Sequence, residues 1–188
     1  MARLSEQGLE ERARRLEGHV LRDVTYQGDA SFVGDVHTTT HAVLLQLDHA
    51  RIEVTAADEL GIVHGTGISL RDRKVVDRAY GPLHAASAKS AWKRLVGTEV
   101  KRAIVHWNDI FDSLRGSLSI GISIHADHLR RRDFPMTLEL DFENGVAFVS
   151  AARLGRDGRA KPLEPELVIY FSEQAGQALG LRSKNAAK

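Results

Sequence analysis

Residues 138–152 have the sequence Leu-Glu-Leu-Asp-Phe-Glu-Asn-Gly-Val-Ala-Phe-Val-Ser-Ala-Ala. Leu138, Leu140 and Phe142 alternate with acidic residues, which is the period-two pattern of a strand with one buried face. Asn144-Gly145 follows, and this dipeptide favours a tight hairpin because both residues tolerate positive φ. The stretch therefore predicts an antiparallel hairpin, and with it a fold that contains an antiparallel sheet.

Landmarks of this hairpin also occur earlier in the chain. Leu45-Gln46-Leu47-Asp48 matches residues 138–141, and residues 54–57 (Val-Thr-Ala-Ala) match residues 149–152 if the second hairpin has two extra residues. Self-similarity of this kind indicates a repeated structural unit. We therefore expect a tandem repeat of two similar modules.

Each module is expected to begin with a short helix. Ser5 is suited to cap the first helix, and apolar residues at helical spacing would form its buried stripe. A glycine follows each stripe, in the matching motifs Arg15-Leu16-x-Gly18 and Arg94-Leu95-x-Gly97. Glycine is common just after a helix because it adopts the left-handed conformation easily. The predicted stripes consist of Leu9, Ala13 and Leu16 in the first helix, and of Ala88, Ala91, Trp92 and Leu95 in the second.

These patterns predict an α+β fold that is predominantly antiparallel β. The first helix-plus-β module covers residues 4–81, and the second covers residues 82–181 and contains an enlarged insert, 108–135. Residues 182–188 are expected to form a flexible tail. The distance from Leu16 to Leu47 is 31 residues and that from Leu95 to Leu140 is 45, so the second module is 14 residues longer there. Whether the modules share one core stays open.

Composition narrows the class of protein. The 188 residues include 26 Lys and Arg and 25 Asp and Glu, a formal net charge of +1. Nucleic-acid-binding domains are usually strongly basic, so this balance disfavours that class. The absence of cysteine excludes disulfides, thiolate metal sites and cysteine nucleophiles. Neither a signal peptide nor an apolar stretch long enough to span a bilayer is recognisable, so we expect a cytoplasmic protein that does not contact a membrane.

Two histidine-containing segments suggest a metal site. His37 and His41 would share one face of an extended segment, and His125 and Asp127 would share a face at the end of a strand, with His128 just beyond. Imidazole and carboxylate groups bind zinc, manganese or iron. The spacing fits no specific metal motif, so histidines that only form hydrogen bonds in polar loops are the alternative.

The insert of the second module also carries features of a protein interface. Arginine and aromatic side chains are enriched in such interfaces. A basic run with a neighbouring phenylalanine lies near the end of the insert, and aromatic residues lie near its start. The residues that we expect to bind a partner are Trp107, Phe111, Arg130, Arg131, Arg132 and Phe134.

The leading hypothesis is a non-catalytic bacterial binding protein, an adaptor or immunity-type module that recognises another protein through this insert and needs no cofactor. No residue is assigned a catalytic role. A small ligand remains open as the binding partner, and so does the oligomeric state. One alternative is a metal-dependent hydrolase or oxygenase that uses the His/Asp residues and a divalent metal. The other is a weak nucleic-acid binder that uses the basic run.

Overall fold

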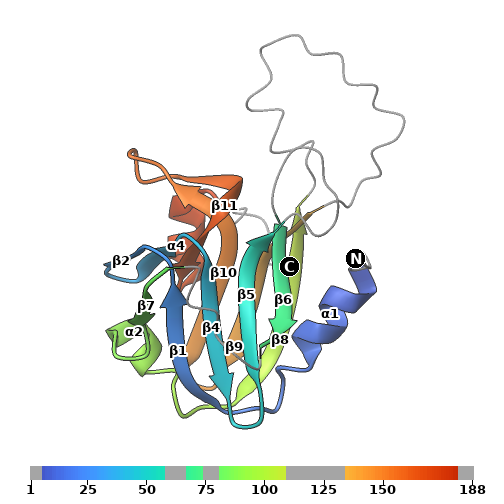
Figure 1. Ribbon diagram of the computed structural model, residues 1–188. Coiled ribbons are helices and arrows are strands. Elements are labelled where there is room, and N and C mark those ends of the chain that lie inside the picture. Colours follow the sequence, from blue (N-terminus) through green and yellow to red (C-terminus); the bar gives the residue numbers. More distant parts are fainter. Residues whose placement is uncertain (1–5, 58–66, 74–80, 109–133, 182–188) are drawn as a thin grey trace, which may run out of the picture.

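A computed structural model describes residues 6–57, 67–73, 81–108 and 134–181 of the chain. Three helices and eleven strands lie in these ranges, and Figure 1 shows their arrangement. In chain order they are α1 (Glu6–Arg14), β1 (Leu21–Gln27), β2 (Ala30–Val33), β3 (Val36–Thr39), β4 (Ala42–Leu47), β5 (Arg51–Ala57), β6 (Gly67–Asp72), β7 (Leu83–Ala85), α2 (Ser90–Lys93), β8 (Val100–Asn108), β9 (Phe134–Phe142), β10 (Gly145–Leu154), β11 (Ala160–Tyr170) and α4 (Glu173–Leu179).

The strands form two antiparallel sheets. The first sheet has the order β6-β5-β4-β1-β7 and the second has the order β2-β3-β11-β10-β9-β8. The expectation of a predominantly antiparallel α+β fold is therefore confirmed. Among the described residues, no helix is long and apolar enough to cross a membrane.

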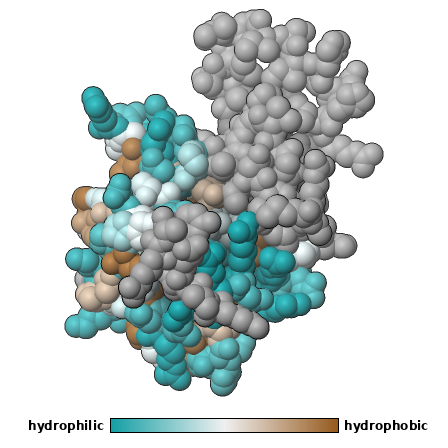
Figure 2. Space-filling view, in the orientation of Figure 1, coloured by the Kyte–Doolittle hydropathy of each residue, from teal (hydrophilic) through white to brown (hydrophobic). Residues whose placement is uncertain are grey.

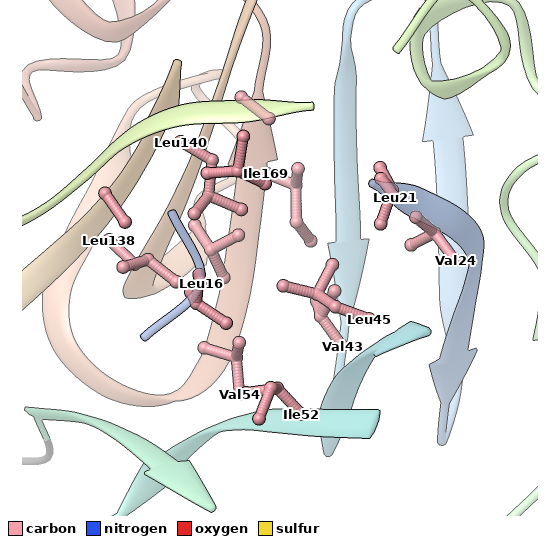
Figure 3. Packing of buried hydrophobic residues seen from close by; sticks show 14 of the residues in the cluster. Leu16, Leu21, Val24, Val43, Leu45, Ile52, Val54, Leu138, Leu140 and Ile169 are labelled. Atoms are coloured by element: carbon pink, nitrogen blue, oxygen red, sulfur yellow. The ribbon is translucent and has the colours of Figure 1, made fainter. Parts of the chain in front are cut away.

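A single large hydrophobic cluster lies between the sheets (Figure 3). Alternate residues of each strand point into it, as period-two patterning requires. The first sheet contributes Val43, Leu45 and Val54, and the second contributes Leu138 and Leu140, all of them buried. A smaller cluster lies on the other face of the second sheet, where Leu179 of α4 and Leu181 accompany the stacked rings of Phe148 and Tyr170.

Helix α1 closes one open side of the sandwich. Its predicted stripe is confirmed, because Leu9, Ala13 and Leu16 are only 2%, 1% and 1% exposed. The Arg12 guanidinium donates a hydrogen bond to the Leu70 carbonyl on β6, over 2.7 Å. Just after the helix, the Glu17 carboxylate accepts the Ala103 N–H of β8, over 3.0 Å. The helix region is therefore hydrogen-bonded to the edge strands of both sheets.

The second predicted helix is shorter than expected. Only Ser90–Lys93 form α2, but Ala91, Trp92 and Leu95 are buried as predicted, while Ala88 is exposed.

The turns after the two helix regions pair with each other. Both glycines have positive φ, 80° at Gly18 and 90° at Gly97, as their predicted position requires. Four reciprocal hydrogen bonds join the segments: Gly18 N–H to Val100 O (2.9 Å), Val100 N–H to His19 O (2.9 Å), Gly97 N–H to Leu21 O (2.8 Å) and Leu21 N–H to Thr98 O (3.0 Å). The two sheets are thus connected through the backbone.

Two details of the predicted hairpins are wrong. Phe142 pairs with Gly145, so the turn consists of Glu143 and Asn144 and lies one residue earlier than Asn144-Gly145. Leu45 pairs with Val24, which lies three residues after the start of β1. Leu140 pairs with Ala103, which lies three residues after the start of β8. Leu45 therefore occupies the position of Leu140 and not that of Leu138, and the second hairpin contains no extra residues.

Some strands pair outside the sheet formed by their neighbours in sequence. β7 pairs with β1, whereas the β2–β3 hairpin pairs with β11 through β3. The remaining strands follow the same order in both sheets, β1-β4-β5-β6 and β8-β9-β10-β11.

Candidate functional site

A hollow of about 580 Å³ lies at the β4–β5 hairpin and the end of β6. Figure 2 shows a mainly hydrophilic surface at this lower end of the molecule. The hollow is lined by Gln46, Asp48, His49, Ala50, Arg51, Asp72 and Arg73. Most of these side chains can form charge-assisted hydrogen bonds, so the hollow is suited to a polar ligand.

Arg51 is held in place by the hairpin itself. The Gln46 side-chain amide donates to the carbonyls of Leu47 (2.9 Å) and Ala50 (3.2 Å), which fixes its orientation in the turn. The Gln46 carbonyl oxygen then accepts the Arg51 Nε–H over 2.8 Å. Within the described part of the chain, the terminal nitrogens of Arg51 have no partner, so this guanidinium is positioned but not neutralised.

Arg73 lies next to Arg51 and is fixed by a buried acid. Its guanidinium is 2.7 Å from the Glu53 carboxylate, and the two side chains are 19% and 1% exposed. The Arg73 N–H donates to the Arg51 carbonyl over 2.8 Å, which continues the ladder beyond β6. The other Glu53 oxygen, Oε1, is buried and has no hydrogen-bond partner in the described part of the chain. The buried Glu53 carboxylate thus balances the charge of Arg73.

Asp48 lies between two imidazoles on the other side of the hollow. Its carboxylate is 2.9 Å from His19 Nδ1 and 3.8 Å from His49 Nε2. Burial acts to raise the pKa of Asp48, but the His19 hydrogen bond and the charges of both imidazoles outweigh it, so the pKa lies below its ordinary value. Asp48 is therefore a carboxylate at neutral pH, already engaged with histidine.

His37, one of the predicted metal ligands, lies inside the core and is 1% exposed. Trp92 Nε1–H donates to the Tyr26 hydroxyl (2.6 Å), and that hydroxyl is 2.9 Å from His37 Nδ1. The ring also hydrogen-bonds the backbone of Gly34. Burial lowers the pKa of His37 below its ordinary value, and the charge of Lys89 lowers it further, against smaller opposing effects of the Gly34 hydrogen bond and the Asp35 charge. His37 is therefore a buried imidazole held by the Tyr26 hydroxyl and the Gly34 backbone.

The expectation that His37 and His41 share a strand face is wrong. β3 ends at Thr39, and the chain then crosses from one sheet to the other, so His41 lies beside β4. Burial lowers the pKa of His41, while Glu53 raises it and Arg73 lowers it. The predicted ligands His125, Asp127 and His128 lie outside the described residues. In the described ranges, no group of three or more His, Asp or Glu side chains could hold a metal ion.

Most of the predicted partner-binding residues also lie outside the described ranges. This is the case for Phe111 and for Arg130, Arg131 and Arg132. Phe134 is described only through its backbone, which pairs with Asn108 at the start of β9. Trp107 packs against the main core, and its buried indole nitrogen has no hydrogen-bond partner among the described residues. Its ring therefore belongs largely to the interior.

The residues of the hollow were not predicted as a site. Residues 45–48 were interpreted only through their match with residues 138–141, and residues 49–51 were assigned no role. A glutamine and an arginine flanking a predicted hairpin turn were the available signal, since residues on the two strands of a hairpin face each other. Arg73 joins them only through the pairing of β5 with β6.

Comparison of the chain with protein-family models, with curated proteins and with solved structures finds no match.

Proposed function

We propose that this protein is a non-catalytic binding protein that recognises an anionic group, a carboxylate or a phosphate, in the hollow at the β4–β5 hairpin. The observation that carries the proposal is the Gln46–Arg51 arrangement, with 2.8 Å between Gln46 Oε1 and Arg51 Nε. Arginine binds carboxylate and phosphate through two parallel N–H groups, and a guanidinium fixed in advance loses less entropy on binding.

The other charges of the hollow define what surrounds the anionic group. The Glu53 carboxylate is paired with Arg73, and the Asp48 carboxylate is paired with His19 and His49. Neither carboxylate is therefore paired with Arg51. Asp72, an exposed carboxylate, also lines the hollow. This combination suits a ligand in which the anionic group is flanked by hydrogen-bond donors.

The test is a titration with inorganic phosphate and, separately, with acetate, followed by the amide NMR signals of residues 48–51. We expect both anions to shift these signals, with the stronger effect identifying the preferred chemistry. Arg51→Gln should weaken binding at least about tenfold, because a hydrogen bond to a charged group contributes about 1.5–3 kcal/mol.

Arg94→Gln is the matched control. Arg94 is exposed and lies near Gly145, beside the β9–β10 hairpin. This variant should bind as the wild type does. Equal binding by wild type and Arg51→Gln, or no response to either anion at millimolar concentration, would contradict the proposal.

The insert predicted to bind a protein partner remains a separate prediction, because nearly all of its residues lie outside the described ranges. Its test is recovery of a partner by wild type and its loss in a variant with alanine at positions 130, 131 and 132.

We also infer that the two halves are a tandem repeat. Three features support this inference: the common strand order, the reciprocal pairing around Gly18 and Gly97, and a bulge at the same place in the first strand of each half. The bulges lie between Leu21 and Asp23 and between Val100 and Arg102, a constant separation of 79 residues.

A further inference from the structure

Three of the four sheet edges are protected. Helix α1 covers β6 and β8, and Arg12 and Glu17 hydrogen-bond main-chain groups of these strands. β7 has only three residues and follows Pro82, which has no N–H to offer a neighbouring strand. Coverage by a helix, short length and proline are the usual means of preventing a sheet edge from pairing with another chain.

The fourth edge, β2, is also short, with four residues, but it has no proline. Its residues, Ala30 to Val33, include no charge and no proline, and it pairs with β3 in continuous register without a bulge. Val33 is 68% exposed, the largest value among the exposed large hydrophobic residues of the described chain. Figure 2 shows hydrophobic surface on the left of the molecule, where Figure 1 places β2 and β7.

Among the described strands, β2 pairs only with β3, which leaves the main chain on its outer side available. Thr40 N–H donates to the Asp29 carbonyl over 3.0 Å, which makes Asp29–Thr40 a hydrogen-bonded pair of the ladder. Hydrogen-bonded and non-hydrogen-bonded pairs alternate along an antiparallel ladder. The next pair, Ala30 with Thr39, is therefore non-hydrogen-bonded, so the N–H and C=O groups of Ala30 and Phe32 are directed away from β3.

Charge at the ends of β2 limits the type of partner. Asp29 and Asp35 are exposed on either side of the strand. A second copy of this chain that paired antiparallel with β2 would bring its own Asp35 close to Asp29, and like charges at neighbouring positions are destabilising. A strand with a basic residue at each end would instead place opposite charges together.

We propose that β2 is a docking edge for an extended segment of another protein, one that carries an apolar side chain to cover Val33 and a basic residue at each end. Such a segment would add a strand to the second sheet, with its main chain bonded to Ala30 and Phe32 and its ends paired with Asp29 and Asp35. This site lies on β2 and does not depend on the hollow at the β4–β5 hairpin.

The test uses two synthetic peptides with the same alternating valine and threonine centre, one flanked by lysines and the other by glutamates. We expect the lysine peptide to bind at least tenfold more tightly and to slow hydrogen exchange at the amides of Ala30 and Phe32. Ala30→Pro should weaken binding at least tenfold, since it removes an outward N–H without breaking a bond to β3. Asp29→Asn with Asp35→Asn should remove the preference for lysine.

Glu99→Gln, an acidic site before β8, is the matched control and should change neither affinity nor preference. Equal binding of the two peptides, undiminished binding by Ala30→Pro, or no binding at millimolar concentration would overturn the proposal. So would a dimer in sedimentation that Val33→Lys dissociates, because β2 would then pair with a second copy.

Discussion

Replacing Tyr26 with Phe removes one hydroxyl group from the core and leaves two buried groups without their hydrogen bond. In the wild type this hydroxyl accepts from Trp92 Nε1, at 2.6 Å, and lies 2.9 Å from His37 Nδ1. Trp92 is 0% exposed and His37 is 1% exposed, so water cannot replace the missing partner without a change in packing.

The expected loss of stability follows from these two groups. A buried polar group left unsatisfied costs about 1–3 kcal/mol. Phe fills nearly the same volume as Tyr, so no large cavity is added to that loss. We therefore expect Tyr26→Phe to reduce the free energy of unfolding by about 3 kcal/mol. For a chain of this length, that corresponds to a fall in Tm of roughly 6–12 °C.

Urea unfolding followed by circular dichroism is the assay, with Trp92→Phe and the double variant completing a cycle. Because Tyr26 and Trp92 share one hydrogen bond, the effects of the two substitutions should not be additive, and we expect a coupling of about 1 kcal/mol or more. A loss below about 0.5 kcal/mol for Tyr26→Phe, or strict additivity, would refute the reasoning, because such small changes are typical of positions without a special interaction.

Three further predictions concern other buried groups. Burial lowers the pKa of His37 in the folded protein below the unfolded pKa of about 6.5. The stability contributed by the neutral imidazole is therefore present above about pH 6.5 and is lost as the pH falls towards the folded pKa. His37→Gln should reduce this loss of stability, measured by urea unfolding between about pH 7.5 and 5. Arg73→Ala should destabilise the protein by about 3–5 kcal/mol, since it leaves the Glu53 carboxylate buried and unpaired, and adding Glu53→Gln should recover a large part of the loss; no recovery would contradict this account. Gly28→Ala should lower Tm more than Gly34→Ala: both glycines have positive φ, 92° and 57°, but only a Cβ at position 28 overlaps Thr40 Oγ1, and equal effects would show that the overlap is relieved easily.

Local patterns were sufficient to predict the helix stripe and the two hairpins. The alternation in residues 138–142 and the glycine after each helix region have causes within a few residues of sequence. The structure confirms the glycines and the burial of Leu138, Leu140 and Phe142, but Glu139 on the opposite face is buried as well. The match of Leu45 with Leu138 was wrong by two residues for an instructive reason. Side chains alternate with period two, so a shift of two residues keeps every leucine on the buried face, and the pattern alone cannot detect it.

Long-range pairing was not predictable in the same way. Nothing near Leu83 or Phe32 in the sequence indicates that β7 joins β1 or that β2 and β3 join β11. The histidine pair failed for a related reason, since the spacing of His37 and His41 was interpreted on one continuous strand, whereas the chain changes sheets after Thr39. The hollow is formed by the β4–β5 hairpin together with the end of β6, and the sequence predicted the hairpin but not the pairing of β5 with β6.

The exchange of strands between the halves has a consequence for how this protein unfolds. A chain cut near Gly81 would give a first fragment without the β7 edge of its sheet and a second fragment whose β11 lacks β3. Each fragment would also lose the backbone bonds between the Gly18 and Gly97 segments. Because these pairings connect the two parts of the chain, we expect neither fragment to fold on its own and the whole chain to unfold in one cooperative transition.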